Sequence, residues 1–355
     1  MTLEDLGYNA ELVQYRLDHQ LEQFEVGRIF SEHKERYGIR TANQELDGEI
    51  IGNLRYTAHT RSDFPTVGDW VALVPYDDDK ALIHAIYPRK SILERQAVGK
   101  KGEKQPIASN IDTALLVQAV DRDFSINRLE RYLTICHASG IEAVVILNKI
   151  DLIDEQTLKT YVEQVQHRMK DIPVFAISNN TKQGIGRLKS IFELGKTYCL
   201  LGSSGVGKST LINTLVGKEL MKTDAIGEHS NRGKHITSHR ELHLLDSGGI
   251  LIDNPGMREV GIADSTGGLE MTFDDIYTWS KHCRFSDCSH VNESGCAVRA
   301  AVESGELDQA SYENYLKMER ERTHFEMTVA EKRKKEKVFG KLMKNYKKSN
   351  YKKDQ

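Results

Sequence analysis

One stretch of this sequence, Gly202 to Ser209, reads Gly-Ser-Ser-Gly-Val-Gly-Lys-Ser and completes the phosphate-loop pattern G-x-x-x-x-G-K-[ST]. An apolar run ends just before the stretch and helical spacing follows it, as this pattern requires. Glycines let backbone N–H groups turn toward phosphates, Lys208 can reach the β and γ phosphate oxygens, and Ser209 can bind Mg²⁺. The predicted phosphate contacts are Gly202, Ser203, Ser204, Gly205, Val206, Gly207, Lys208, Ser209 and Thr210.

A second pattern, Asn148-Lys149-Ile150-Asp151, follows a buried-strand pattern at 143–147 and points to guanine. The Asp151 carboxylate can accept hydrogen bonds from the N1–H and the exocyclic amine of guanine, a donor pair that adenine lacks. Asn148 is expected to hold the loop and the base, and the Lys149 stem to pack along base and ribose. Ser178, after the apolar run 173–177, supplies the expected companion loop. Taken alone, the tetrapeptide also fits an ordinary strand-to-helix turn.

The order of these patterns is unusual, because in most Ras-like GTPases the phosphate loop comes first and the guanine pattern last. The sequence therefore predicts a circularly permuted GTPase domain. Asp253-Asn-Pro-Gly256 fits the D-x-P-G element, in which Asp253 holds Mg²⁺ and Gly256 senses the γ-phosphate. Thr237 is the expected switch threonine, which gives Ser209 and Thr237 as magnesium ligands. The alternatives are that Thr237 is a plain loop threonine and that Asp253-Asn-Pro-Gly256 is a plain turn.

Hydrolysis should be slow in the isolated protein, because Met257 stands where many GTPases place a water-orienting glutamine. Another residue or a partner must then orient the attacking water. His235, His229 and Arg232 are the candidates in the preceding segment, and a solvated loop is the alternative role for each. The predicted catalytic residues are Lys208, Thr237 and His235.

Three thiols and one imidazole lie close together near the C-terminal end, at Cys283, Cys288, His290 and Cys296. This set matches a closed tetrahedral Zn²⁺ site with four protein ligands and no open position for chemistry, so the predicted role is structural. In a reducing compartment such crowding favours metal binding over disulfides, and unliganded cysteines are the alternative. The other two cysteines, Cys136 and Cys199, have core spacing.

Composition favours a multidomain globular protein: the chain has 355 residues, of which 39% are hydrophobic and 28% charged. No apolar run is long enough to cross a bilayer, and residues 1–20 lack the order of a signal peptide, so we expect a cytoplasmic protein with no membrane partner. The net charge of -3 hides a basic C-terminal end. Residues 332–353 carry eleven cations against Glu336, which is typical of a segment that meets nucleic-acid phosphate, although a solubilising tail is the alternative.

Changes of pattern along the chain define five expected segments. Short alternating runs, among them 24–30, 49–55, 69–74 and 81–87, predict a β-barrel of the OB type, whose arginines at 28, 36, 40, 55 and 61 and whose Tyr56 could contact RNA. A polar linker is expected at 97–106, and a helix at 126–138 between buried strands of a βαβ unit. The expected segments are an N-terminal extension (1–25), the OB-type barrel (26–107), a permuted α/β P-loop GTPase domain (108–264), a mainly α zinc-binding domain (265–330) and a basic tail (331–355).

Together these features resemble the ribosome small subunit-dependent GTPase A family, also called RsgA or YjeQ. The resemblance also uses Gly68-Asp-Trp-Val71 in the barrel and Pro88-Arg-Lys90 leading to Arg95. It implies a GTPase that binds the small ribosomal subunit and its rRNA late in maturation, checks the decoding region and leaves on hydrolysis. It further implies GTP and GDP as substrate and product, Mg²⁺, one structural Zn²⁺ and a monomer.

Three positions depart from the family's pattern: Asn254 replaces the usual Thr, Ser178-Asn179 replaces Ser-Ala, and Lys234-His-Ile-Thr replaces His-Thr-Thr. None removes a phosphate or metal ligand, but Asn179 alters the guanine side of the site. The competing class is a GTP-regulated RNA-binding or signalling module without a ribosomal role. An ATP-using P-loop enzyme is a third class, and Asp151 argues against it.

Overall fold

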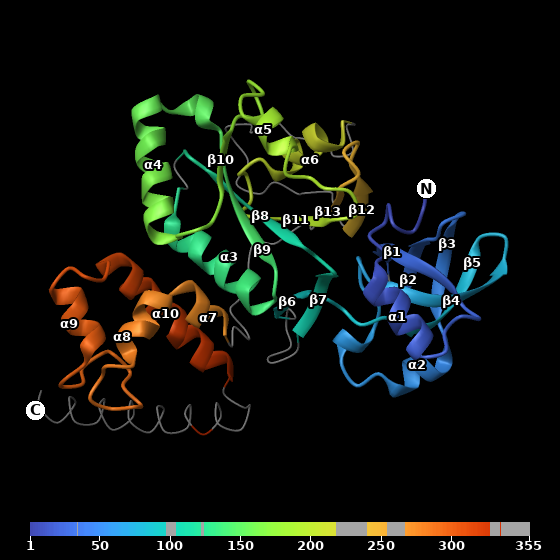
Figure 1. The fold of residues 1–355 in the computed structure, drawn as a ribbon, viewed down its shortest axis with the longest axis horizontal. Coiled ribbons are helices and arrows are strands. Elements are labelled where there is room, and N and C mark those ends of the chain that lie inside the picture. Colours follow the sequence, from blue (N-terminus) through green and yellow to red (C-terminus); the bar gives the residue numbers. More distant parts are fainter. Residues whose placement is uncertain are drawn as a thin grey trace, which may run out of the picture.

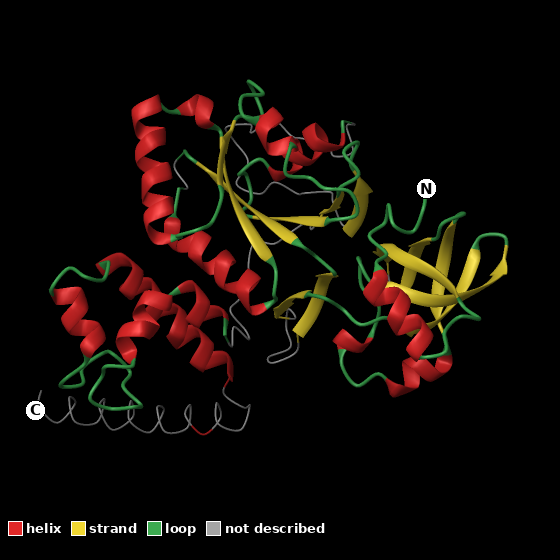
Figure 2. Cartoon of the chain, in the orientation of Figure 1, coloured by secondary structure: helices red, strands yellow, loops and turns green. Residues whose placement is uncertain are grey.

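The computed structural model describes residues 1–33, 35–96, 104–121, 124–217, 240–253, 267–326 and 334. Figure 1 shows three regions along the chain: a small barrel, a central sheet flanked by helices, and a group of C-terminal helices. The central sheet lies between the other two regions. Figure 2 shows that strands occupy the first two regions and that the third is helical.

The N-terminal region contains a closed five-stranded barrel, as predicted. Neighbouring strands follow the order β1-β2-β3-β5-β4, and β4 pairs again with β1 to close the ring. Only β3 and β5 pair in parallel, which is the strand arrangement of an OB-type barrel. The strands are β1 (Glu25–His33), β2 (Arg36–Arg40), β3 (Glu45–Ile50), β4 (Trp70–Asp77) and β5 (Lys80–Ile86).

The prediction of one barrel strand is wrong in its second half. The run 49–55 was predicted to be extended, but β3 ends at Ile50 and helix α2 (Gly52–Thr57) begins two residues later. The apolar alternation stops at Ile50, and no residue of α2 is buried. Tyr56 is 88% exposed there, and the partly buried Leu54 is the α2 side chain that packs against the barrel core.

The N-terminal extension packs on the barrel. Helix α1 (Ala10–Asp18) begins after Asn9, whose side chain accepts a hydrogen bond from the Leu12 backbone N–H at 3.1 Å. Leu6, Tyr8 and Leu12 are buried in one cluster with Trp70 of β4. Burial of these apolar side chains fixes the extension against the outside of the barrel.

The central sheet has the order β10-β9-β8-β11-β13-β12, and all its strands are parallel except β12. In a parallel sheet the carboxyl ends of the strands meet at one edge, which is where ligands bind. The loops after four strands, β9, β10, β11 and β13, carry the predicted nucleotide residues. The strands are β8 (Thr113–Ala119), β9 (Glu142–Asn148), β10 (Val174–Ile177), β11 (Thr197–Leu201), β12 (Arg240–Leu244) and β13 (Ile250–Asp253).

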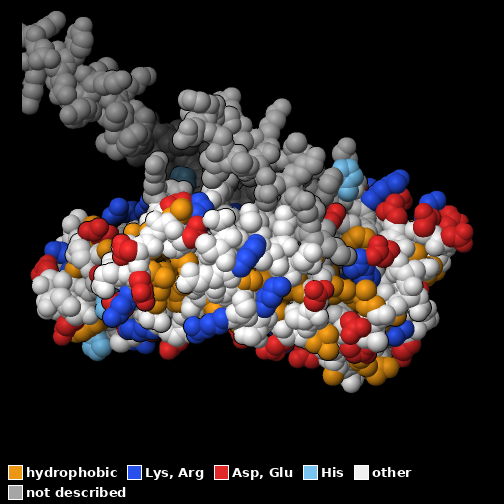
Figure 3. All heavy atoms as spheres, turned by 90° about the horizontal axis from the view of Figure 1, so that it is seen from above, with side chains coloured by type: hydrophobic (Ala, Val, Ile, Leu, Met, Phe, Trp, Pro, Cys, Tyr) orange, Lys and Arg blue, Asp and Glu red, His pale blue; other side chains and the backbone are white. Residues whose placement is uncertain are grey.

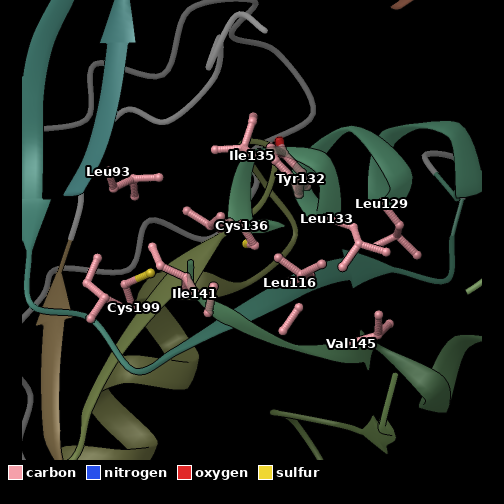
Figure 4. Close-up of a cluster of buried hydrophobic side chains, with 14 of the residues drawn as sticks. Leu93, Leu116, Leu129, Tyr132, Leu133, Ile135, Cys136, Ile141, Val145 and Cys199 are labelled. Atoms are coloured by element: carbon pink, nitrogen blue, oxygen red, sulfur yellow. The ribbon is translucent and has the colours of Figure 1, made fainter. Parts of the chain in front are cut away.

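Helices cover both faces of this sheet. Helices α3 (Ile126–Ala138) and α4 (Glu155–Arg168) bury their apolar sides in one cluster, part of which Figure 4 shows around Leu116, Leu133 and Cys199. Helices α5 (Ile185–Lys189) and α6 (Lys208–Val216) pack in a second cluster on the other face. The near-continuous apolar strands follow from this double burial, and α3 has the bounds predicted from sequence.

The barrel and the central sheet are joined in three ways. Strand β1 pairs with β12 through Ser31 and Glu32, so the two sheets are continuous. Strand β6 (Ile92–Gln96) pairs with β7 (Lys104–Ser109), and residues 104–106, which we expected in a polar linker, belong to this hairpin. Arg28 forms the third connection.

The Arg28 side chain is buried at the junction, 2% exposed, which corrects its predicted role as an RNA contact. Its Nη1 donates to the Leu6 carbonyl at 2.5 Å, its Nε to the Gly68 carbonyl at 3.2 Å, and its Nη2 to Thr197 Oγ1 on β11 at 2.9 Å. Burial lowers the pKa of Arg28 to about 10, so the side chain stays protonated at neutral pH. It holds the extension, the barrel and the central sheet together.

The C-terminal region is helical, as predicted, and packs against α3. Gly268 approaches α3 so closely that a Cβ there would lie 2.4 Å from the Thr134 carbonyl oxygen, and Thr134 and His137 both contact the Thr272 hydroxyl at 3.0 Å. The helices are α7 (Gly268–Thr272), α8 (Asp274–Ser280), α9 (Ala297–Glu303) and α10 (Gln309–Glu326). The first two were not assigned from sequence.

On the face shown in Figure 3, the Lys and Arg side chains of the described residues are interspersed with Asp and Glu. Several barrel arginines have acidic partners: Arg36 lies 3.5 Å from Asp47, and Arg55 lies 2.9 Å from Glu35. The expected basic tail at 331–355 lies outside the described residues, apart from Lys334. Within the described ranges, no helix combines the length and apolar character needed to cross a membrane.

Candidate nucleotide and metal sites

The phosphate loop connects β11 to α6 at the carboxyl edge of the central sheet. Gly205 and Gly207 have φ values of +81° and +94°, which favour glycine. At Gly202 a Cβ would lie 2.3 Å from the Val117 carbonyl oxygen, so only glycine permits the close passage of the loop over β8. Ser209 and Thr210 lie in the first turn of α6, where a helix N-terminus favours phosphate.

Lys208 lies over its own loop. Its Nζ donates to the Gly202 carbonyl at 2.7 Å and to the Ser203 carbonyl at 2.6 Å. The ammonium group therefore lies inside the turn of the loop, where it can reach phosphate oxygens. This geometry suits the predicted contact with the β and γ phosphates.

The guanine-side residues lie on two adjacent strand ends. Asn148 is 1% exposed, and its Nδ2 donates to the Val206 carbonyl of the phosphate loop at 2.7 Å. Ser178 is buried at the end of β10, and its Oγ donates to Asp151 Oδ1 at 2.6 Å. The structure thus brings together Asn148, Asp151, Ser178 and the phosphate loop, which are far apart in sequence.

Asp151 itself is exposed and ionised. The hydrogen bond from Ser178 is the main cause that lowers the pKa of Asp151 below its ordinary value. An exposed carboxylate with one oxygen held by a hydroxyl can present its other edge to two donors of a base. This arrangement suits the N1–H and amine of guanine.

Lys149 precedes this aspartate and has a left-handed backbone, with φ of +67°. Its Nζ lies 2.7 Å from Asp121 Oδ2, just after the end of β8. The ion pair fixes the end of the lysine stem and leaves its methylenes to cover a base. Asp121 was not predicted, although its position after the apolar run 111–117 places it at the same sheet edge.

Asp253 ends β13 and is 7% exposed. Burial raises the pKa of Asp253 to about 7, and the charge of Lys208 opposes this rise. A buried carboxylate at this edge fits a hard divalent cation, which would supply the missing positive charge. The other predicted switch residues, Thr237, His235, His229, Arg232, Gly256 and Met257, lie outside the described residues.

The four predicted zinc ligands converge between α8 and α9. Their ligand atoms all lie within 4.8 Å of one another, with Cys283 Sγ 3.9 Å from Cys296 Sγ, and His290 Nδ1 3.6 Å and 3.5 Å from these sulfurs. Tetrahedral Zn²⁺ with bonds of about 2.3 Å to sulfur requires sulfur separations of about 3.8 Å. The four residues therefore fit a metal with this ligand preference.

Hydrogen bonds support this cluster from outside. The Tyr312 hydroxyl of α10 donates to the His290 carbonyl at 2.6 Å, and the Arg299 backbone N–H of α9 donates to Cys296 Sγ at 3.4 Å. His290 has a φ of +59°, which turns the chain back toward the sulfurs. Such partners orient the ligands of a metal site.

The fold and the site define a P-loop GTPase in which the strand ends at Asn148 and Ser178 precede the phosphate loop in the chain. The family profile described as RsgA GTPase matches residues 86–263, and this chain belongs to that family. A profile described as ABC transporter also matches residues 186–353, a stretch that contains the same phosphate loop.

Similar proteins support this assignment over nearly the whole chain. One relative, small ribosomal subunit biogenesis GTPase RsgA 1 of Bacteroides thetaiotaomicron, is 39% identical over 96% of both chains. Another, RsgA 2 of Listeria monocytogenes, is 40% identical over 90% of this chain and 89% of its own. Among solved structures, YjeQ from Thermotoga maritima matches with a TM-score of 0.62 and 27% identity over 83% of this chain and 96% of its own. YloQ, described as a circularly permuted GTPase, matches with 0.63 and 26% over 88% and 99%.

Proposed function

We propose that this protein is a GTPase of small ribosomal subunit biogenesis, which binds the subunit late in maturation, hydrolyses GTP with stimulation by the subunit, and leaves on hydrolysis. The observation that carries the proposal is the permuted nucleotide site in a chain that aligns over 96% of its length with a relative named for this role. Its site of action is the cytoplasm, and it acts as a monomer.

The proposed nucleotide contacts divide by chemistry. Asp151, Asn148, Lys149 and Ser178 bind guanine, and residues 202–210 bind the phosphates with Mg²⁺ on Ser209 and Asp253. Thr237 is a further proposed magnesium ligand, Gly256 the proposed γ-phosphate sensor, and His235 a proposed catalytic residue with Lys208. The geometry of the sheet edge supports the proposed contacts with guanine and the phosphates. The place of Thr237, Gly256 and His235 in the sequence pattern supports the roles proposed for them.

The proposed metal is one structural Zn²⁺ on Cys283, Cys288, His290 and Cys296. The ligand set and its separations support zinc, because three thiolates and an imidazole with no open position are typical of a structural site. The proposed RNA contacts are the exposed side chains of the barrel and the basic tail, which would meet rRNA phosphates.

The experiment that tests the function is GTP turnover by the full chain with and without purified small subunits. We expect slow turnover alone and a large increase with subunits, and no turnover in either condition for Lys208→Ala. Equal turnover in both conditions would favour a general GTP switch with no ribosomal role. Turnover of ATP in place of GTP would contradict the guanine assignment.

A further inference from the structure

Asn179 connects the base side of the nucleotide site to the phosphate side. It follows Ser178 at the end of β10, and its Nδ2 donates to the Gly207 carbonyl at 3.0 Å. The preceding carbonyl of the same loop, that of Val206, accepts from Asn148 Nδ2 at 2.7 Å. Two amide side chains from two base-side loops therefore hold two consecutive carbonyls of the phosphate loop.

These contacts leave little free space around the loop. A Cβ on Gly207 would lie 2.4 Å from Asn148 Nδ2 and 3.1 Å from Asn179 Nδ2. The Asn179 backbone N–H also donates to Asn148 Oδ1, at 3.4 Å, so the two asparagines are joined to each other. Because a carbonyl only accepts, the Gly207 contact fixes which end of the Asn179 amide faces the loop.

The oxygen end of the Asn179 amide gains no hydrogen bond from the fold of the described residues. Asn179 Oδ1 is buried and has no hydrogen-bond partner among the described residues. A buried acceptor without a donor opposes folding, and this cost offsets the gain from the Nδ2 bond. The side chain therefore needs an explanation other than stability.

We propose that Asn179 is a positioning residue that couples base binding to the shape of the phosphate loop. The base orders the loop at 178–180 through Asp151 and Ser178, and Asn179 transmits that order to the Gly207 carbonyl. The Gly207–Lys208 peptide, which begins the phosphate-binding helix, is then held in its binding orientation before the phosphates arrive. The inference rests on the proposed function.

The test compares binding of GDP and of guanosine, which lacks the phosphates, to the full chain by calorimetry. Asn179→Ala should weaken GDP binding about five-fold, the usual effect of one hydrogen bond, and guanosine binding less than about two-fold. Asn179→Asp should weaken GDP binding more than the alanine variant, because a carboxylate would face the Gly207 carbonyl. Asn53→Ala, an exposed asparagine on α2, is the matched control and should change neither affinity.

Stability serves as the second measurement. The ligand-free Asn179→Ala protein should unfold within about 2 °C of the wild type, since the lost bond and the removed orphan acceptor offset each other. Unchanged GDP affinity in the alanine variant, or equal losses for GDP and guanosine, would overturn the coupling while leaving the GTPase assignment intact. A wild-type chain that binds neither ligand would overturn the proposed function, and this inference with it.

Discussion

At the scale of single residues, the proposed guanine selection depends on keeping Asp151 ionised. A neutral acid would present a donor where guanine also presents donors. The Ser178 hydroxyl lowers the pKa of Asp151 and orients one of its oxygens at the same time. The residue can therefore remain exposed, and open to a base, without losing its charge at neutral pH.

Asp151→Asn should weaken GTP binding by roughly 100-fold, because two hydrogen bonds to a charged acceptor contribute on the order of 3 kcal/mol. The amide can donate to the extra oxygen of xanthine, so the same variant should gain affinity for XTP. Competition binding of GTP and XTP to the wild type and to the Asp151→Asn variant measures the change in base preference. An Asp151→Asn protein with wild-type GTP affinity would refute the base assignment.

Lys208 makes a different contribution, since its ammonium donates to the Gly202 and Ser203 carbonyls of its own loop. Lys208→Ala should lower the already slow GTP turnover by about 100- to 1,000-fold, the usual effect of removing one charge-stabilising donor, which leaves no detectable turnover. Single-turnover kinetics at saturating GTP is the measurement. Lys189→Ala, an exposed lysine on α5, is the control and should hydrolyse GTP at the wild-type rate.

At the scale of elements, α3 connects the nucleotide region to the C-terminal helices through charged groups. Glu130 is 1% exposed and accepts from Arg168 Nε at 2.8 Å and from Asn314 Nδ2 of α10 at 2.6 Å. The neighbouring Arg131 pairs with Glu321 at 2.6 Å, but both side chains are about a quarter exposed. The two pairs have similar geometry and different burial.

This difference predicts unequal costs for removing each pair. Glu130→Ala should destabilise the protein by about 3 kcal/mol, because it leaves Arg168 buried without its main partner. Arg131→Ala should cost at most about 1 kcal/mol, the value for exposed pairs. Urea unfolding of both variants makes the comparison. Equal losses would show that burial does not decide the cost of removing these two pairs.

The cluster of Cys283, Cys288, His290 and Cys296 is the second feature at the scale of elements. Between α8 and α9 the ligand segment has turns but no helix or strand, so few backbone hydrogen bonds hold it. Cys288→Ser should reduce bound zinc from about one equivalent per chain and speed hydrogen exchange in α9 and α10. GDP affinity should stay at the wild-type value. A metal-free wild type with slow exchange in these helices would contradict a structural metal.

Regular patterns were predictable from the sequence and tertiary pairings were not. Helix α3 and the strands around the phosphate loop were predicted because their residues show clear apolar spacing. Strand β12 was not assigned, since Arg240–Leu244 mixes charged and apolar residues and is defined by its pairing with β1 and β13. The Arg28 prediction failed for a related reason: only the folded chain brings the carbonyls of Leu6 and Gly68 to its guanidinium.

The nucleotide site, too, was predictable from the sequence only in part. Asn148, Asp151, Ser178 and the phosphate loop lie together because parallel strands end at one edge, which the order of motifs predicts. The Lys149–Asp121 ion pair and the Asn179–Gly207 bond depend on side-chain reach across neighbouring loops. Sequence patterns give the backbone frame for such contacts but not the contacts themselves.

At the scale of the whole molecule, the nucleotide sheet lies between the barrel and the C-terminal helices (Figure 1). The barrel joins it through β1–β12 and Arg28, and the C-terminal helices join it through α3. A partner that contacts both outer regions would therefore be attached to the nucleotide site from two sides. In the proposed function the basic tail would add a third, electrostatic contact.

The last prediction concerns that tail, whose eleven cations at 332–353 are separated in sequence from every predicted nucleotide contact. Truncation after Met327 should leave GTP turnover by the isolated protein unchanged and reduce the subunit-stimulated rate. Each phosphate contact that is lost should lower the steepness with which subunit binding weakens as salt rises. Titrations of subunits at two or more salt concentrations give this slope for the full and truncated chains. If both chains show the same slope and the same stimulated rate, the tail has no part in subunit binding and acts only as a solubilising segment.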